Sequence, residues 1–163
     1  MANKKRRGDA VQLGHDPKQV AEYLLCKAKD AGKSLTPMQI LKLVYIAHGW
    51  NLGLYGNPLI NESVEAWQYG PVIPSLYHAY KRFGSSPIDD CPGAGPNEFG
   101  NDERRVMDQV WSGYGSRSGI SLSTLTHQPG SPWFISYNEQ GRGATISNDL
   151  IEDHYRRLSE ARR

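Results

Sequence analysis

One segment of the chain is apolar around most of its circumference, and it constrains the fold more than any other. It runs from Pro37 to Gly53, begins with a capping-box pattern at Thr36 and Gln39, and ends before Gly56. Its broad apolar face consists of Ile40, Leu41, Val44, Tyr45, Ala47 and His48. Such a helix must be buried among other elements. The sequence therefore predicts one central helix with the rest of the chain packed around it.

The remaining periodic segments are mostly helical and short. Helical spacing and capping residues occur at about 16–32, 73–83, 102–113 and 147–158. A shorter helix, capped by Ser118 or Ser121, is expected to run through His127, and a short helical turn begins at 132. Residues 63–69 alternate like a short strand that stops at Gly70-Pro71, and 144–146 could add a second strand. The predicted fold is mainly α, a compact single domain of about five to six helices with a small β element.

Two segments fall outside this pattern. Residues 1–15 are polar and basic and are expected to form a flexible arm, which leaves 16–163 as the helical domain. The stretch 84–100 is rich in Gly and Pro and is expected to be a long loop, either mobile or partner-facing. No apolar run approaches the roughly 20 residues of a membrane span, and no secretory signal is recognised. Cys26 and Cys91 lack metal-ligand spacing, so a reduced, cytoplasmic protein is expected.

The net charge of +2 hides an asymmetry along the chain. Residues 8–155 hold 11 Lys and Arg against 16 Asp and Glu, a net charge of −5, whereas both ends are basic. A nucleic-acid-binding domain usually carries a basic stripe on its folded face. The mildly acidic body therefore argues against DNA binding except through the terminal segments.

The polar residues do not form a recognisable catalytic or metal site. The five histidines lack metal-ligand spacing, and His48 is expected to be a hydrogen-bonded core residue. Ser123 and His127 could meet on one helix face, but no nucleophile elbow surrounds Ser123 and no acid is placed to orient His127. His127 is instead expected to cap a helix end. No catalytic, cofactor-binding or metal-binding residue is predicted.

Aromatic residues offer a different kind of site. Most of the many Trp and Tyr residues must belong to the core, but those in turns could anchor a partner, because Trp and Tyr dominate binding hot spots. Tyr69 beside Gly70 and Trp133 after Pro132 are the two that stand in turns.

Five short motifs together resemble a known family. They are 41–48 (LKLVYIAH), 65–74 (EAWQYGPVIP), 110–115 (VWSGYG), 122–127 (LSTLTH) and 132–133 (PW), in that order. The sequence resembles the Panacea domain family of SocA-like and phage-associated GepA-like proteins over about residues 17–158. The family-pattern residues are Tyr45, His48, Glu65, Trp67, Tyr69, Gly70, Pro71, Pro74, Leu122, His127 and Trp133.

The resemblance implies an antitoxin, not an enzyme, that neutralises a small protein toxin by direct binding. Its toxin gene would lie beside its own, or a phage copy would block a host toxin. Tyr69, Trp67, His127 and Trp133 are the candidate partner-binding residues. An acidic body would suit a basic toxin. Inhibition could occlude the toxin's active site or deliver the toxin to a bacterial protease. The alternative function is a nucleic-acid-binding regulator that uses the basic termini; a small hydrolase or metal enzyme is a third.

Overall fold

The computed structural model describes residues 14–89 and 98–162. Its helices are α1 (Pro17–Asp30), α2 (Pro37–Tyr55), α3 (Pro74–Tyr80), α4 (Asn101–Tyr114), α5 (Gly119–Thr126), α6 (Pro132–Gln140) and α7 (Asn148–Ala161), with a 3-10 turn η1 (Lys81–Phe83) after α3. The strands β1 (Val64–Trp67), β2 (Gly70–Val72) and β3 (Ala144–Ile146) form one antiparallel sheet in the order β2-β1-β3. The prediction of a mainly α fold with a small β element is confirmed, although the sheet has three strands.

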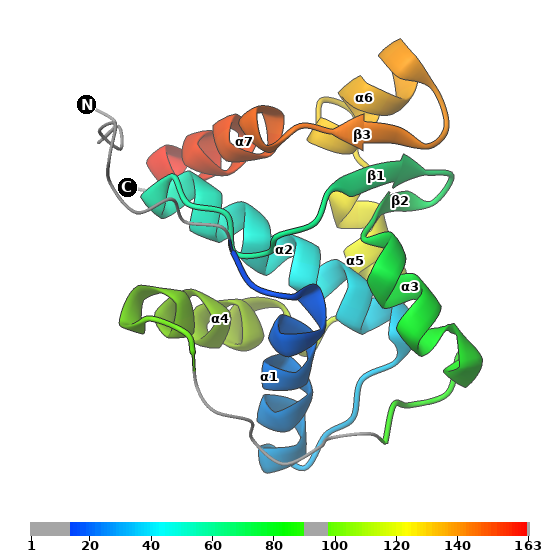
Figure 1. Cartoon of the computed structure of the whole chain (residues 1–163), viewed down its shortest axis with the longest axis vertical. Helices are drawn as coiled ribbons and strands as arrows, with labels where there is room; N and C mark the ends of the chain where they lie inside the picture. Colours follow the sequence, from blue (N-terminus) through cyan, green and yellow to red (C-terminus); the bar gives the residue numbers. More distant parts are fainter. Residues whose placement is uncertain (1–13, 90–97, 163) are drawn as a thin grey trace.

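Helix α2 forms the centre of the molecule, as its sequence predicts. The backbone N–H of Thr36 donates to Gln39 Oε1 at 2.8 Å and the N–H of Gln39 to Thr36 Oγ1 at 3.4 Å, which completes the capping box. The helix ends at Gly56, whose φ is +71°. Of its 19 residues, 14 are buried. Helix α7 covers one side of α2, and α1, α4 and α5 pack on its other faces (Figure 1).

The contact between α2 and α7 depends on two glycines one helical turn apart. A Cβ atom at Gly49 would lie 2.2 Å from Cε2 of Tyr155, and one at Gly53 would lie 2.7 Å from the backbone carbon of Tyr155. Real Cβ atoms do not approach other heavy atoms this closely. The two glycines therefore set the distance between the helices, and the ring of Tyr155 fills the space that they leave.

The predicted strand does not simply stop at Gly70-Pro71. The chain turns at Gln68 and Tyr69 and pairs back on itself, with Trp67 opposite Gly70 and Ala66 opposite Pro71. Gly70 has a φ of +123°, a conformation that residues with a side chain rarely adopt. Pro71 is tolerated because β2 is an edge strand. The strands β1 and β2, together with the turn at Gln68 and Tyr69 that joins them, are called the hairpin below.

Three further expectations concern particular segments. The helical turn expected at 132 is a nine-residue helix, α6.

Cys26 is half-buried on α1 and is not the free thiol that was expected. Cys91 lies outside the described residues. Most of the expected arm and residues 90–97 of the expected loop also lie outside them. His15, at the end of that arm, forms an isolated bridge with Ile60.

Candidate partner-binding site

The hairpin is held in place by donors from three different helices. Trp133 on α6 donates its indole N–H to the carbonyl oxygen of Trp67 at 2.6 Å. Ser123 on α5 donates its hydroxyl to the carbonyl oxygen of Tyr69 at 2.8 Å. Lys42 on α2 donates to the carbonyl oxygen of Pro71 at 2.9 Å. Because carbonyl groups removed from water need partners, these contacts fix the position of the turn.

The four residues predicted from the sequence as partner-binding lie together around this hairpin. The rings of His127 and Trp133 meet edge to face with centroids 5.3 Å apart, and Trp133 in turn bonds to the backbone of Trp67. Their exposures differ, however. Tyr69 is 68% exposed at the tip of the turn, whereas Trp133 is only 8% exposed. Tyr69 is therefore exposed to solvent, whereas the buried Trp133 supports the turn from beneath.

His127 caps helix α5, as predicted, and does not form a catalytic pair. Its Nδ1 faces the backbone carbonyl oxygen of Ser123 and donates to it. The hydroxyl of Ser123 points instead to the backbone of Tyr69. The two side chains thus have separate structural partners. Within the described residues, no group of three or more metal-ligating side chains occurs.

His48 is the hydrogen-bonded core residue that the sequence predicts. It is fully buried, its Nδ1 accepts from the backbone N–H groups of Leu59 at 3.2 Å and Ile60 at 3.3 Å, and its Nε2 lies 3.0 Å from Asn148 Oδ1. Burial lowers its pKa to about 4, and the hydrogen bond to Asn148 opposes this shift. At neutral pH the ring is therefore uncharged.

Sequence reasoning missed Lys42, which is the least expected group at this site. Its side chain is only 4% exposed and donates to the carbonyl oxygens of Pro71 and, at 3.4 Å, Tyr69. Burial lowers its pKa to about 8. It forms no ion pair with any carboxylate of the described residues. The signal was a lysine inside the broad apolar face of a central helix.

A cavity of about 640 Å³ opens beside the hairpin, lined mainly by apolar atoms. Its wall combines residues from α2, the hairpin, α3 and its following turn, α5 and the loop before β3. The lining residues are Pro37, Met38, Leu41, Lys42, Trp67, Gln68, Tyr69, Val72, Tyr77, Lys81, Gly84, Ser123, Arg142 and Gly143. This surface is called the hairpin cavity. Tyr77 is 37% exposed here.

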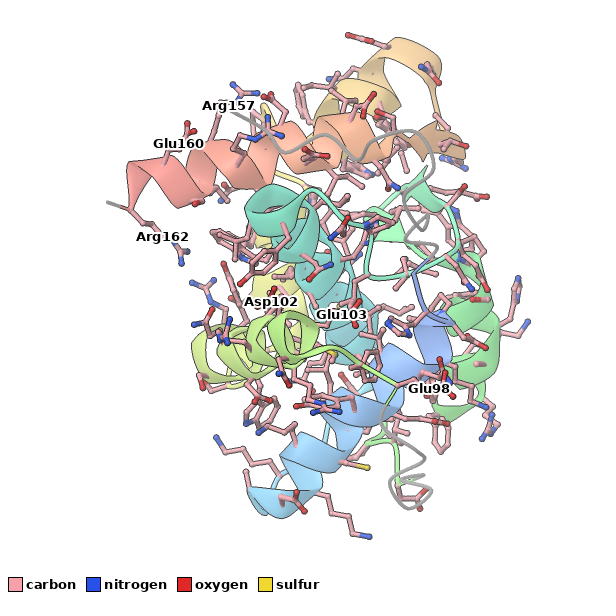
Figure 2. The ribbon with its side chains drawn as sticks, turned by 60° about the vertical axis from the view of Figure 1, so that its left-hand side comes forward. Glu98, Asp102, Glu103, Arg157, Glu160 and Arg162 are labelled. Atoms are coloured by element: carbon pink, nitrogen blue, oxygen red, sulfur yellow. The ribbon has the colours of Figure 1, made fainter. Side chains whose placement is uncertain are left out.

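A second cavity, of about 730 Å³, lies at the start of α4 and is mostly polar. Figure 2 shows Glu98, Asp102 and Glu103 at this end of α4. Nε2 of His15 lies 2.9 Å from Oε1 of Glu103, and Arg105 pairs with Asp102 at 2.8 Å. Three acidic residues thus line this second cavity, whereas none lines the hairpin cavity.

Three basic residues near the C-terminus, which lie in the described part of the chain, are engaged within the fold. Arg156 pairs with Glu152 and Arg157 with Asp153 along α7. The guanidinium of Arg162 lies 4.8 Å from the ring centroid of Trp50. Figure 2 shows Arg157 and Arg162 on this helix together with Glu160. These residues do not form the uncompensated basic stripe that typifies nucleic-acid-binding faces. The basic N-terminal residues lie outside the described ranges.

No helix in the described part of the chain has the length and apolar character needed to cross a bilayer.

A central apolar helix, a hairpin fixed by three helices and an apolar cavity beside that hairpin define a mainly helical domain. The family model described as Antitoxin SocA-like, Panacea domain, matches residues 40–134, from α2 into α6. The chain is also 30% identical over 157 residues to Antitoxin SocA of Caulobacter vibrioides strain NA1000 / CB15N, covering 86% of this chain and 82% of that protein. The protein belongs to the SocA-like antitoxin family with a Panacea domain, which confirms the resemblance. No solved structure gives a significant match.

Proposed function

We propose that this protein is an antitoxin that neutralises a small protein toxin by binding it directly at the hairpin cavity. Its family supports an antitoxin role, and membership of an antitoxin family also favours a non-enzymatic function. A toxin that acts inside the cell that makes it would be met in the cytoplasm, so this is the proposed location.

One observation supports the hairpin cavity as the binding surface. Six large apolar side chains of the described residues are exposed, and three of them line the hairpin cavity: Met38, Tyr69 and Tyr77. Contiguous exposed apolar surface of this kind marks interaction sites. Tyr69 adds a large aromatic group on a rigid turn, the type of residue that anchors interfaces. The three backbone contacts to the hairpin keep this anchor in place before any partner arrives, which reduces the entropy lost on binding.

The experiment is co-expression of the tagged protein with the product of its neighbouring gene, with growth and co-purification measured together. The wild-type protein is expected to restore growth and to form a stoichiometric complex. Tyr69→Ala is expected to lose both while keeping the thermal stability of the wild type, because the side chain is 68% exposed. Tyr55→Ala is the matched control, since Tyr55 is 39% exposed and lines the polar cavity instead.

The outcomes separate the alternatives. Loss of binding in Tyr55→Ala but not in Tyr69→Ala would assign the toxin to the polar cavity and contradict the proposal. Rescue without a stable complex, accompanied by a falling toxin level, would indicate delivery to a protease. Rescue with unchanged toxin and no complex would contradict direct binding.

A further inference from the structure

The charged residues at the hairpin cavity are all of one sign. Its described lining contains Lys42, Lys81 and Arg142 and no Asp or Glu. This is the reverse of the body as a whole, where residues 8–155 carry a net charge of −5. It also differs from the polar cavity at α4, whose lining contains Glu98, Asp102 and Glu103.

The three cationic side chains differ in how far they are buried. Lys42 is 4% exposed and is directed at the hairpin backbone from inside the fold, while Lys81 and Arg142 are exposed. The ammonium of Lys81 lies 5.9 Å from the ring centroid of Tyr77. None of the three forms an ion pair with a carboxylate of the described residues. A buried ammonium that contacts only carbonyl oxygens lacks the anionic partner that best offsets its lost hydration.

The apolar wall restricts the kind of anion that fits. Met38, Leu41 and Val72 line the cavity beside Lys42. A small hydrated anion would leave these side chains in contact with water, whereas apolar groups on either side of a carboxylate would cover them. Charge complementarity and apolar lining together describe a protein segment of mixed character.

We propose that the hairpin cavity binds a segment of the toxin in which an Asp or Glu side chain lies between apolar residues, with its carboxylate paired to Lys42. Lys81 and Arg142 attract the segment, and the apolar wall buries its flanking side chains. This inference rests on the proposed function. It differs from the expectation that an acidic body selects a basic toxin, because the surface that receives the toxin is itself cationic.

The test measures the dissociation constant of the purified protein with the product of the neighbouring gene. Lys42→Met is expected to weaken binding at least about 30-fold, mainly through faster dissociation, as is usual when one partner of a buried charge pair is truncated. Lys29→Met removes the same charge from an exposed position on α1 and is expected to change the constant less than about twofold. Lys42→Gln keeps a hydrogen-bond donor without the charge and carries the test if Lys42→Met does not fold.

The two exposed cations of the hairpin cavity, Lys81 and Arg142, form its rim and are tested separately. The double variant Lys81→Glu/Arg142→Glu is expected to slow association and to reduce its dependence on salt, because rim charges act on encounter. The matched control is Lys29→Glu/Lys33→Glu, which changes the net charge equally at exposed positions on and just after α1. An equal effect of the two double variants would show that only net charge matters and would overturn the role given to the cavity.

Substitutions in the toxin provide the decisive experiment. Each of its Asp and Glu residues is changed to Asn or Gln, and one such change is expected to weaken binding to the wild type but not to weaken binding to Lys42→Met further. If no acidic position behaves in this way, or if only amidation of the toxin's C-terminus does, the proposed side-chain pairing is wrong. A wild-type protein that fails to bind the toxin overturns the proposed function and this inference with it. Tight binding that is unchanged by Lys42→Met overturns the inference alone.

Discussion

The indole N–H of Trp133 reaches the carbonyl oxygen of Trp67, 66 residues earlier in the chain, at 2.6 Å. This bond joins α6 to the strand end that leads into the exposed turn. Trp133 also stacks on Tyr137, with ring centroids 4.8 Å apart and planes 26° from parallel. One side chain thus belongs both to the packing of α6 and to the support of the hairpin.

Trp133→Phe separates these two roles. The phenyl ring keeps most of the packing but cannot donate, so the hydrogen bond from α6 to the carbonyl oxygen of Trp67 is lost. We expect the free energy of unfolding to fall by about 1–3 kcal/mol, measured by urea denaturation. Trp111→Phe is the control, because the indole of Trp111 is half-buried and donates to no atom of the described residues. An equal loss in both variants would show that ring size matters and the hydrogen bond does not.

Gly70→Ala tests the backbone of the hairpin. At a φ of +123° a side chain strains the backbone, and the new Cβ would lie 2.9 Å from Nζ of Lys42. We expect a loss of roughly 1–3 kcal/mol in the free energy of unfolding. Gly32→Ala is the comparison: its φ is +72°, in the left-handed helical region, and nothing lies near its Cβ position. A smaller loss is expected there, of about 1 kcal/mol. Equal losses would contradict a special role for Gly70.

Gly49→Ala tests the contact between α2 and α7. The added methyl group would overlap the ring of Tyr155, so overpacking should cost about 1–3 kcal/mol or more. Gly113→Ala makes the same change in helix α4, where no atom lies within 4 Å of the new Cβ. That variant should be more stable than the wild type by up to about 1 kcal/mol, because alanine favours helix. Thermal unfolding of both variants would show whether the two changes have opposite signs.

His48 gives a dependence of stability on pH. Its pKa is about 4 in the folded protein and 6.5 in the unfolded chain, so the unfolded chain takes up a proton first as the pH falls. Stability contributed by the neutral ring is therefore complete above pH 6.5 and is lost between pH 6.5 and 4. The expected loss over that range is about 3 kcal/mol.

His48→Gln provides the comparison, because all other titrating groups are shared and their effects cancel in the difference. Chemical denaturation at several pH values between 4 and 7 would measure the difference in the free energy of unfolding between the two proteins. Parallel pH profiles of the two proteins would show that His48 is not the group responsible.

The sequence predicted the central helix well because its signals are local. Thr36 and Gln39 form the capping box within one turn, and the apolar face of α2 is continuous. The hairpin was missed because Gly70-Pro71 usually ends a strand. Its pairing depends on the φ of Gly70 and on donors from helices that lie far away in the sequence.

The candidate site was predicted only in part. Aromatic residues in turns pointed to Tyr69 and Trp133, and the structure brings these together with Trp67 and His127. Which of them is exposed could not follow from residue type, since Tyr69 and Trp133 both stand near turns. The place of Lys42 in the apolar face of α2 signals that it is buried, but its hydrogen-bond partners could not be predicted because they lie on the hairpin, 27 and 29 residues further along.

The close fit of Tyr155 against Gly49 and Gly53 has a consequence for how the protein is made. Helix α2 leaves the ribosome early, but the helix that covers it follows 92 residues later. At a synthesis rate of ~5–20 residues per second, about 5–20 s pass before the apolar side of α2 can be closed. During this interval the nascent chain exposes part of a helix that buries 14 of its 19 residues in the folded protein. Each newly made molecule is therefore vulnerable to aggregation until its last helix has been synthesised and has docked.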